Sequence, residues 1–382
     1  MNLELFYADN FQLYLYYALL GVFVMQIIYF LGFFSNFSFI GKPKIEASKQ
    51  QAVSVVICAR NEYYSLEKNL PLILEQDYPN FEVLIVNDFS DDDTKDLLND
   101  FSRKYNNLSI VNVEKSNNFF KGKKFPLALG IKSAKHDLIL LTDADCWPND
   151  KNWINTMQRQ FAKPNVKIVL GYGGYKAEKG FLNKLIRFDT LMIALQYFSF
   201  AKMGMPYMGV GRNLAYRKSF FIEKKGFVNH YHVSSGDDDI FVNQNGSKKN
   251  TVIEFEMESH TISDPKTDFQ SWIYQKSRHL KTGKFYKFYH IILLALFPLT
   301  TMAFYALSAV MLAKFHDLYT IIIVSSLFLI RICSQLLITK KAMLKLNEKN
   351  LLFLAPFLEL YLLFFNGYLM LLNIFKQESR WK

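Results

Sequence analysis

Two groups of acidic residues have types and spacing that suit chemistry on a phosphorylated ligand. The first is Asp143-Ala144-Asp145, two carboxylates separated by one residue, which directly follows the apolar run Leu138–Leu141. Mg²⁺ and Mn²⁺ prefer oxygen ligands and keep coordination positions open for phosphate oxygens, so this pair suits a hard divalent cation. Solvated acids in an ordinary turn are the simpler interpretation, because Asp is favoured in turns.

The second group is Gly236-Asp237-Asp238-Asp239, about ninety residues further along the chain. Three adjacent carboxylates repel one another, which raises the proton affinity of at least one of them if the group is partly buried. A raised proton affinity is the property that a general base needs. The simpler interpretation is an acidic helix N-terminus that is favoured by the helix dipole.

The elements that must position these acids follow an alternating pattern from Val53 onward. Short apolar runs alternate with amphipathic segments, which is typical of βαβ units and predicts an α/β domain. We expect strands at Val53–Ala59, Phe81–Asp88, Leu108–Val113 and Leu138–Leu141. Ligands of open α/β sheets bind at the carboxyl ends of the strands, so Asp88 and Asp143 are expected to face one crevice.

Apolar segments flank this domain on both sides. Each is nearly free of charge and long enough to cross a bilayer as a helix: Phe11–Phe34, Ile291–Ala313, Leu318–Ile338 and Leu351–Phe375. Acidic residues precede the first segment and lysines follow it, which predicts a retained anchor with its N-terminus outside and the next domain in the cytoplasm. The lysines in question are Lys42, Lys44 and Lys49.

The remaining charges refine this topology. A loop after the third apolar segment is expected to be cytoplasmic because it is rich in lysine; its lysines are Lys340, Lys341, Lys345 and Lys349. Four crossings from an external N-terminus place the C-terminal tail outside the cell. This tail is basic, which conflicts with the rule that positive flanks are cytoplasmic; its basic residues are Lys376, Arg380 and Lys382. The predicted division is an anchor at 1–40, a catalytic domain at 50–280, an interfacial segment at 281–290 and membrane helices at 291–382.

Composition narrows the class of partner. The formal net charge is +11 and 51% of the residues are hydrophobic. Lys and Arg are dispersed and flank the apolar segments, which favours an anionic membrane surface and argues against nucleic acid. Three cysteines without metal-like spacing, namely Cys58, Cys146 and Cys333, indicate a reducing compartment and no disulfide framework.

The order of six short motifs resembles the membrane-embedded family 2 glycosyltransferases. The motifs are VSVVICARNE, VNDFSDDDT, GKKFPLALGI, TDADC, GDDD and QKSRH, and they extend over about Val53–Tyr289. The family includes cellulose, hyaluronan and poly-N-acetylglucosamine synthases and ceramide glucosyltransferase. The resemblance implies a GT-A fold, a Rossmann-like α/β domain with a mixed, mostly parallel sheet. This cytoplasmic domain would lie between one N-terminal and about three C-terminal transmembrane helices.

The resemblance also assigns roles to individual residues. It implies a nucleotide-sugar site at Ala59, Arg60, Glu62, Asp88, Lys123, Asp143, Gln275, Arg278 and His279. Asp145, with Asp143, would hold Mg²⁺ or Mn²⁺ against the diphosphate, and Arg278 would help to neutralise it. Asp239 would be the general base, with Asp238 as the alternative.

Two residues depart from the family pattern, and one further segment matches it. Ala128 stands where relatives usually have Asn, which removes one expected donor contact. His279 replaces the Trp that lies against the acceptor sugar in the synthases, which weakens the case for a processive polymerase. Gly209–Arg217 resembles the segment that lines the acceptor site.

The predicted function is an inverting, metal-dependent transfer of a sugar from a nucleotide diphosphate sugar. A UDP-sugar is the expected donor, and the acceptor is a lipid or a glycan at the cytoplasmic face of the cell membrane. Membrane lipids and accessory membrane subunits are the other partner classes that this prediction admits. Two alternatives stay open: a processive polysaccharide synthase that moves its product through its helices, and a non-catalytic membrane scaffold with a nucleotide-binding fold.

Overall fold

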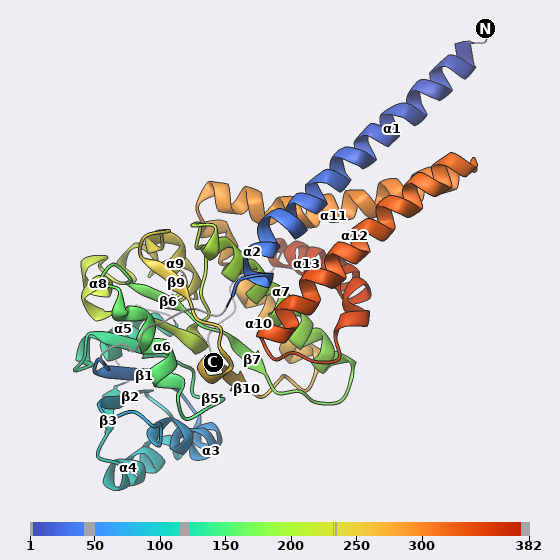
Figure 1. Ribbon diagram of the computed structural model, residues 1–382. Helices are drawn as coiled ribbons and strands as arrows, with labels where there is room; N and C mark the ends of the chain where they lie inside the picture. Colours follow the sequence, from blue (N-terminus) through green and yellow to red (C-terminus); the bar gives the residue numbers. More distant parts are fainter. Residues whose placement is uncertain (1–2, 42–49, 115–121, 232, 234, 376–382) are drawn as a thin grey trace.

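A seven-stranded sheet forms the centre of the protein. The computed structural model describes residues 3–41, 50–114, 122–231, 233 and 235–375. The strands of the large sheet lie in the order β3-β2-β1-β4-β8-β6-β9, and a smaller sheet has the order β5-β10-β7 (Figure 1). Their bounds are β1 Val53–Ala59, β2 Phe81–Asp88, β3 Leu108–Val113, β4 Leu138–Leu141, β5 Cys146–Pro148, β6 Ile168–Leu170, β7 Gly173–Tyr175, β8 Leu214–Arg217, β9 Thr251–Ile253 and β10 Thr261–Ser263.

The central strands are buried on both faces, as their continuous apolar sequences require. Along β1, Val55 and Ile57 pack into the core beneath α3 and α6, whereas Val56 packs into the opposite core beside α5 and α7. Successive side chains of a strand point to opposite faces, so one apolar run supplies both cores. These helices are α3 Tyr63–Leu74, α5 Lys124–Ser133, α6 Trp153–Gln158 and α7 Phe181–Lys202.

The strand directions confirm the predicted mixed, mostly parallel sheet. β1 pairs in parallel with both β2 and β4, β2 with β3, and β6 with β9, whereas β8 pairs antiparallel with β4 and β6. The chain therefore runs outward in both directions from β1. Such a reversal of strand order opens a crevice at the carboxyl ends of the strands. Arg60 follows β1 at this edge, and Asp143 lies just beyond β4.

Four helices in the described part of the chain are long and apolar enough to cross a membrane, one before the sheet domain and three after it, as predicted. They are Asn10–Ser38, Phe288–Lys314, Leu318–Lys345 and Leu352–Asn373. The first begins within α1 (Leu3–Ile27) and continues through a π-helical turn at Ile28–Phe34 and α2 (Ser35–Ser38). The second and third are α11 (Phe288–Lys314) and α12 (Leu318–Lys345), and the fourth includes most of α13 (Ala355–Phe375). In Figure 1, α1 and α12 extend away from the sheets.

One detail of the predicted topology is wrong. Lys340, Lys341 and Lys345 lie in the last turns of α12, not in a loop, because the helix continues beyond its apolar stretch. Only Lys349 of this group follows the helix. The lysines at 42–49 and the basic tail at 376–382 lie outside the described residues.

The last apolar helix is tied to the sheet domain. It packs against α10 (Phe269–Leu280) and α7, where the ring of Phe365 stacks on Trp272 with 4.7 Å between centroids. Asn373 Nδ2 donates to the Ser277 carbonyl oxygen at 3.1 Å. The preceding loop is fixed by a buried ion pair between Glu348 and Arg187 of α7. These contacts fix α13, one of the four candidate membrane-spanning helices, against the sheet domain.

Candidate active site

One cavity of about 1700 Å³ brings both acidic groups together. It opens at the carboxyl ends of β1 and β4 and reaches the membrane helices. The predicted site residues that line it are Arg60, Glu62, Lys123, Asp143, Asp145, Asp238, Asp239, Gln275, Arg278 and His279. Ala59 and Asp88 belong to the ends of β1 and β2 and are buried behind this wall, and Ala128 is buried in α5. The cavity therefore gathers residues from distant parts of the chain.

The turn after β1 is fixed by the neighbouring turn after β2. The Asn61 N–H donates to Ser90 Oγ at 3.0 Å, and the guanidinium of Arg60 stacks on the Phe89 ring at 4.1 Å. Asn61 and Phe89 both have positive φ, 56° and 41°. Burial raises the pKa of Asp88, and the positive charge of Arg60 partly opposes this rise. The two turns form a shaped, polar rim at the edge of the sheet.

Asp143 forms an ion pair with Lys123, the residue just before α5. Burial acts to raise the pKa of Asp143, but the charges of Lys123 and Arg212 outweigh it and hold the pKa below its usual value. The next residue, Lys124, is buried and donates through Nζ to the carbonyl oxygens of His230 (2.7 Å) and Val233 (3.0 Å). The start of α5 thus holds Asp143 and also supports the loop that leads to the second acidic group.

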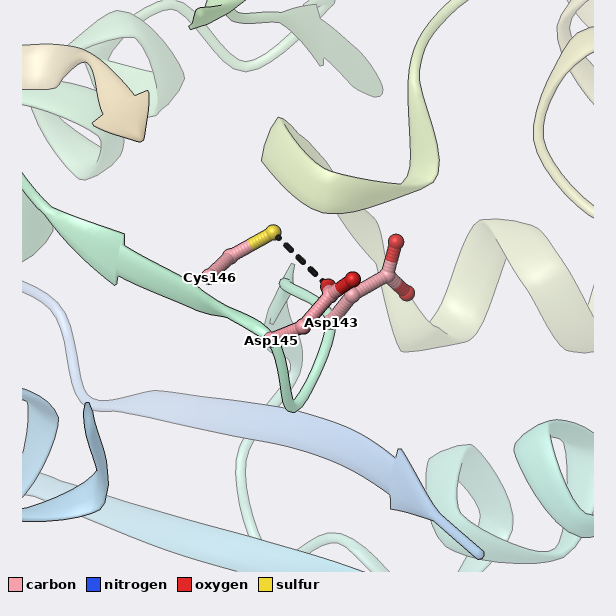
Figure 2. A group of neighbouring side chains, drawn as sticks. All are labelled: Asp143, Asp145 and Cys146. Carbon is pink, nitrogen blue, oxygen red and sulfur yellow. Dashed lines mark hydrogen bonds between the residues drawn. The ribbon is translucent and has the colours of Figure 1, made fainter. Parts of the chain in front are cut away.

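Asp143 and Asp145 fit a hard divalent cation. Their carboxylates lie with the Cys146 thiol in a group whose potential ligand atoms are within 4.8 Å of one another (Figure 2). Cys146 Sγ contacts Ser263 Oγ at 2.9 Å, and burial together with Asp145 raises the thiol pKa well above its usual range. Mg²⁺ and Mn²⁺ prefer oxygen ligands to sulfur ligands. The two carboxylates, of which Asp145 is the more exposed, are therefore the groups that suit the cation.

The second acidic group stands at the start of α9 (Asp239–Asn245). Asp238 Oδ2 accepts from the Gly211 N–H at 2.7 Å, and its Oδ1 accepts from the Asp239 N–H at 2.8 Å. Burial and the charges of Asp237 and Asp239 raise the pKa of Asp238 to about 8. This carboxyl group can therefore exchange a proton near neutral pH.

Asp239 is held more tightly than its neighbour. Its Oδ1 accepts from the Ile240 N–H at 2.7 Å, and its Oδ2 accepts from the Tyr286 hydroxyl at 2.7 Å and from the Thr282 hydroxyl. Only 7% of the residue is exposed. Burial raises the pKa of Asp239, whereas the two hydroxyl donors oppose that rise.

Helix α10 carries the predicted Gln-x-x-Arg residues to the cavity. Gln275 Nε2 donates to Tyr175 Oη at 3.2 Å. Arg278 Nε is buried and has no hydrogen-bond partner within the described chain, so it is available to an anionic ligand. Partial desolvation in the cavity and the charges of Arg278 and Lys276 lower the pKa of His279. His279 is therefore a neutral side chain at the edge of the cavity.

Among the cavity residues that sequence reasoning did not predict individually, three lie close to the acidic groups or to the predicted Gln275. Arg212, whose guanidinium lies 4.4 Å over the Tyr175 ring, was included only in a segment resembling an acceptor site. Thr282 and Tyr286 belong to the segment expected at the membrane interface, yet both donate to Asp239. Tyr and Lys near an apolar helix suggested an interfacial role, and no sequence signal linked them to a residue some forty positions earlier.

A buried ion pair holds α10 in place and gives a stability prediction. Lys276 Nζ pairs with Asp189 of α7, and both side chains are about nine-tenths buried. Replacing Asp189 with alanine leaves a buried ammonium without its counter-ion, so we expect a loss of about 3–5 kcal/mol of stability. Thermal unfolding of the purified protein in detergent measures the change. The double variant Asp189→Ala/Lys276→Met is the control and should lose less. An unchanged melting temperature for Asp189→Ala would contradict the argument.

Part of the chain matches a known protein family. Residues 54–223 match the family described as "Glycosyl transferase family 2". The chain is 28% identical over 193 residues to Glycosyltransferase AglE of Haloferax volcanii, which covers 48% of this chain and 58% of that protein. It is 26% identical over 142 residues to a poly-beta-1,6-N-acetyl-D-glucosamine synthase of Staphylococcus epidermidis. This match covers 37% of this chain and 33% of the synthase. The chain thus spans a third to three fifths of the length of these relatives.

A solved structure supports the fold over a longer part of the chain. The mannosyltransferase PcManGT from Pyrobaculum calidifontis, in complex with GDP-Man and Mn²⁺, superposes with a TM-score of 0.56. The superposition covers 86% of this chain and 98% of that chain at 17% sequence identity. The likeness concerns the arrangement of helices and strands.

Proposed function

We propose that this chain, which carries a family 2 glycosyltransferase domain of GT-A fold, transfers a sugar from a nucleotide diphosphate sugar to an acceptor hydroxyl at the membrane. The observation that carries the proposal is the single cavity lined by Asp143 and Asp145 at one sheet edge and by Asp238 and Asp239 at the start of α9. Lysines that flank the spanning segments support a cytoplasmic position for the domain.

The donor side of the cavity suits a nucleoside diphosphate. Arg60 and Glu62 form the rim beside β1, where the base and ribose would bind. A divalent cation held by Asp145 and Asp143 would supply positive charge beside the diphosphate oxygens. The structural relative bound to GDP-Man and Mn²⁺ supports this class of donor and cation. The Arg278 guanidinium can donate in bidentate fashion to the departing diphosphate, which favours the transition state because charge builds up there.

The acceptor side supports Asp238 as the general base. Each of its oxygens accepts one hydrogen bond from a backbone N–H, which leaves lone pairs for an acceptor hydroxyl. Asp239, the base suggested by the sequence, already receives three donors. We therefore assign Asp239 a positioning role: it holds the segment that carries Thr282 and Tyr286. The acceptor oxygen attacks the anomeric carbon, the bond to the diphosphate breaks, and Asp238 takes the hydroxyl proton.

A donor screen tests the proposed function. Purified full-length protein is incubated with single UDP- and GDP-sugars in the presence of Mg²⁺ or Mn²⁺, and released nucleoside diphosphate is measured. Release is expected even without an acceptor, because a site that activates the leaving group also allows slow hydrolysis of the donor by water. Among the donors, we expect a UDP-sugar to be turned over. Removing the cation with EDTA should abolish the release. Absence of release with every donor and both cations would favour the non-catalytic alternative.

A further inference from the structure

The cavity that holds the catalytic acids continues between the membrane helices. Its far walls are formed by α11 and α13, and they are largely apolar. The residues that line it include Leu294, Leu299 and Met302 of α11 and Glu359, Leu363 and Asn366 of α13. One continuous space therefore connects a polar reaction site to an apolar groove.

The groove opens sideways along the spanning helices. Leu299, Met302 and Met370 line the cavity and are also 58%, 50% and 58% exposed. At 1.5 Å per residue, Leu299 and Met302 lie roughly 16 and 21 Å along α11 from its first residue, Phe288. This depth falls within the apolar span Phe288–Lys314. When α11 crosses a bilayer over this span, the mouth of the groove would open to hydrocarbon and not to the aqueous phase.

Two polar side chains of α13 interrupt the apolar wall. Glu359 is 93% buried, and its Oε2 accepts from Arg331 of α12 at 2.8 Å. Its Oε1 has no hydrogen-bond partner in the described part of the chain, and the same holds for Asn366 Oδ1. The two residues are seven positions apart, which places them on one face of α13. Unpaired polar atoms in an apolar wall are costly, so they indicate a ligand that carries hydrogen-bond donors.

We propose that the acceptor is an amphipathic membrane lipid that enters sideways between α11 and α13. This inference rests on the proposed function and names its acceptor class. The lipid chain lies in the apolar groove, and a hydroxyl of its headgroup reaches Asp238. Glu359 and Asn366 accept hydrogen bonds from donors in the headgroup or its linkage. A water-soluble glycan threaded through the helices would instead need a predominantly polar wall.

The first test measures where the transferred sugar goes. The full-length protein is reconstituted in phosphatidylcholine nanodiscs that contain either diacylglycerol or ceramide, lipids whose headgroup carries a free hydroxyl, and radiolabelled donor is added in separate reactions. We expect organic-extractable label with one of these lipids, carrying a single sugar. Donor hydrolysis without organic-extractable product from any of them would overturn the lipid acceptor but keep the proposed function. A complete lack of donor turnover would overturn both.

The second test places a bulky side chain in the mouth of the groove. Met302→Trp should raise the KM for the lipid acceptor by about tenfold, a typical penalty for a misfit in an apolar pocket. Val310→Trp is the matched control, because Val310 is 41% exposed on the same helix and lies outside the cavity. An equal KM in both variants would overturn the proposed entry route.

A binding measurement covers the case in which the Met302 variant fails to fold. A diazirine-bearing diacylglycerol is crosslinked to the wild-type protein in the same nanodiscs, and the labelled peptides are mapped by mass spectrometry. We expect crosslinks to the groove residues of α11 and α13, including Leu294 and Leu363, which are only partly exposed. Crosslinks confined to outward-facing residues such as Val310 would contradict the proposal.

Discussion

Replacing Asp238 with asparagine is expected to lower the rate of sugar transfer by about 10²- to 10⁴-fold, the usual contribution of a general base. The amide keeps the size of the side chain but cannot take the acceptor proton. Donor affinity should change little, because the donor contacts lie at the other acidic group. Transfer of labelled sugar gives the rate, and calorimetric titration with the nucleoside diphosphate gives the affinity.

Asp239→Asn is the matched control for this variant. It keeps one oxygen for Thr282 and Tyr286, so the loss of activity should be smaller, on the order of tenfold. A steep loss in Asp239→Asn with near-normal turnover in Asp238→Asn would return the base to Asp239, as the sequence suggested. The pH profile gives an independent check. The base acts as a carboxylate and its pKa is raised to about 8, so wild-type turnover should increase as pH rises toward 8.

The sequence predicted those parts of the fold that are determined locally. β1, β2, β3 and β4 begin and end at the predicted residues, because each is rich in apolar and β-branched residues and is bounded by polar turns. The spanning helices were equally clear from their length and hydropathy. Helix α7 was not recognised as an element, although it is 22 residues long. This helix is covered by the sheets, α2 and α13 on most of its surface. Its sequence therefore lacks the periodic polar face by which a surface helix is recognised.

The candidate site was predictable to the extent that its residues occur in short motifs. Asp143, Asp145 and the triplet at Asp237–Asp239 share the cavity that the resemblance implied. Which acid of the triplet suits the base could not be decided from sequence, because the choice depends on Thr282 and Tyr286. Their contacts with Asp239 depend on the position of α10, which is joined to α7 by the Lys276–Asp189 ion pair, and on the turn that leads into α11. Such contacts between distant segments leave no spacing pattern in the chain.

Replacing Asp145 with alanine is expected to weaken Mn²⁺ binding and to lower donor turnover by about two to three orders of magnitude, since charge stabilisation by a metal is worth several kcal/mol. Asp145 is the carboxylate that offers the more exposed oxygen, whereas Asp143 already pairs with Lys123. Mn²⁺ affinity is measured by electron paramagnetic resonance of the free ion, which does not depend on activity. The fold should be retained, because the side chain of Asp145 is exposed in the cavity.

Cys146→Ser is the control that separates oxygen from sulfur ligation at this site. The thiol lies next to both carboxylates, but Mn²⁺ prefers oxygen ligands, so the serine variant should bind Mn²⁺ as the wild type does. If Cys146→Ser weakens Mn²⁺ binding as much as Asp145→Ala does, the thiolate is a ligand and the site prefers a softer cation. If neither variant changes the affinity, the cation binds elsewhere. In that case Asp145 acts on the donor through its charge alone.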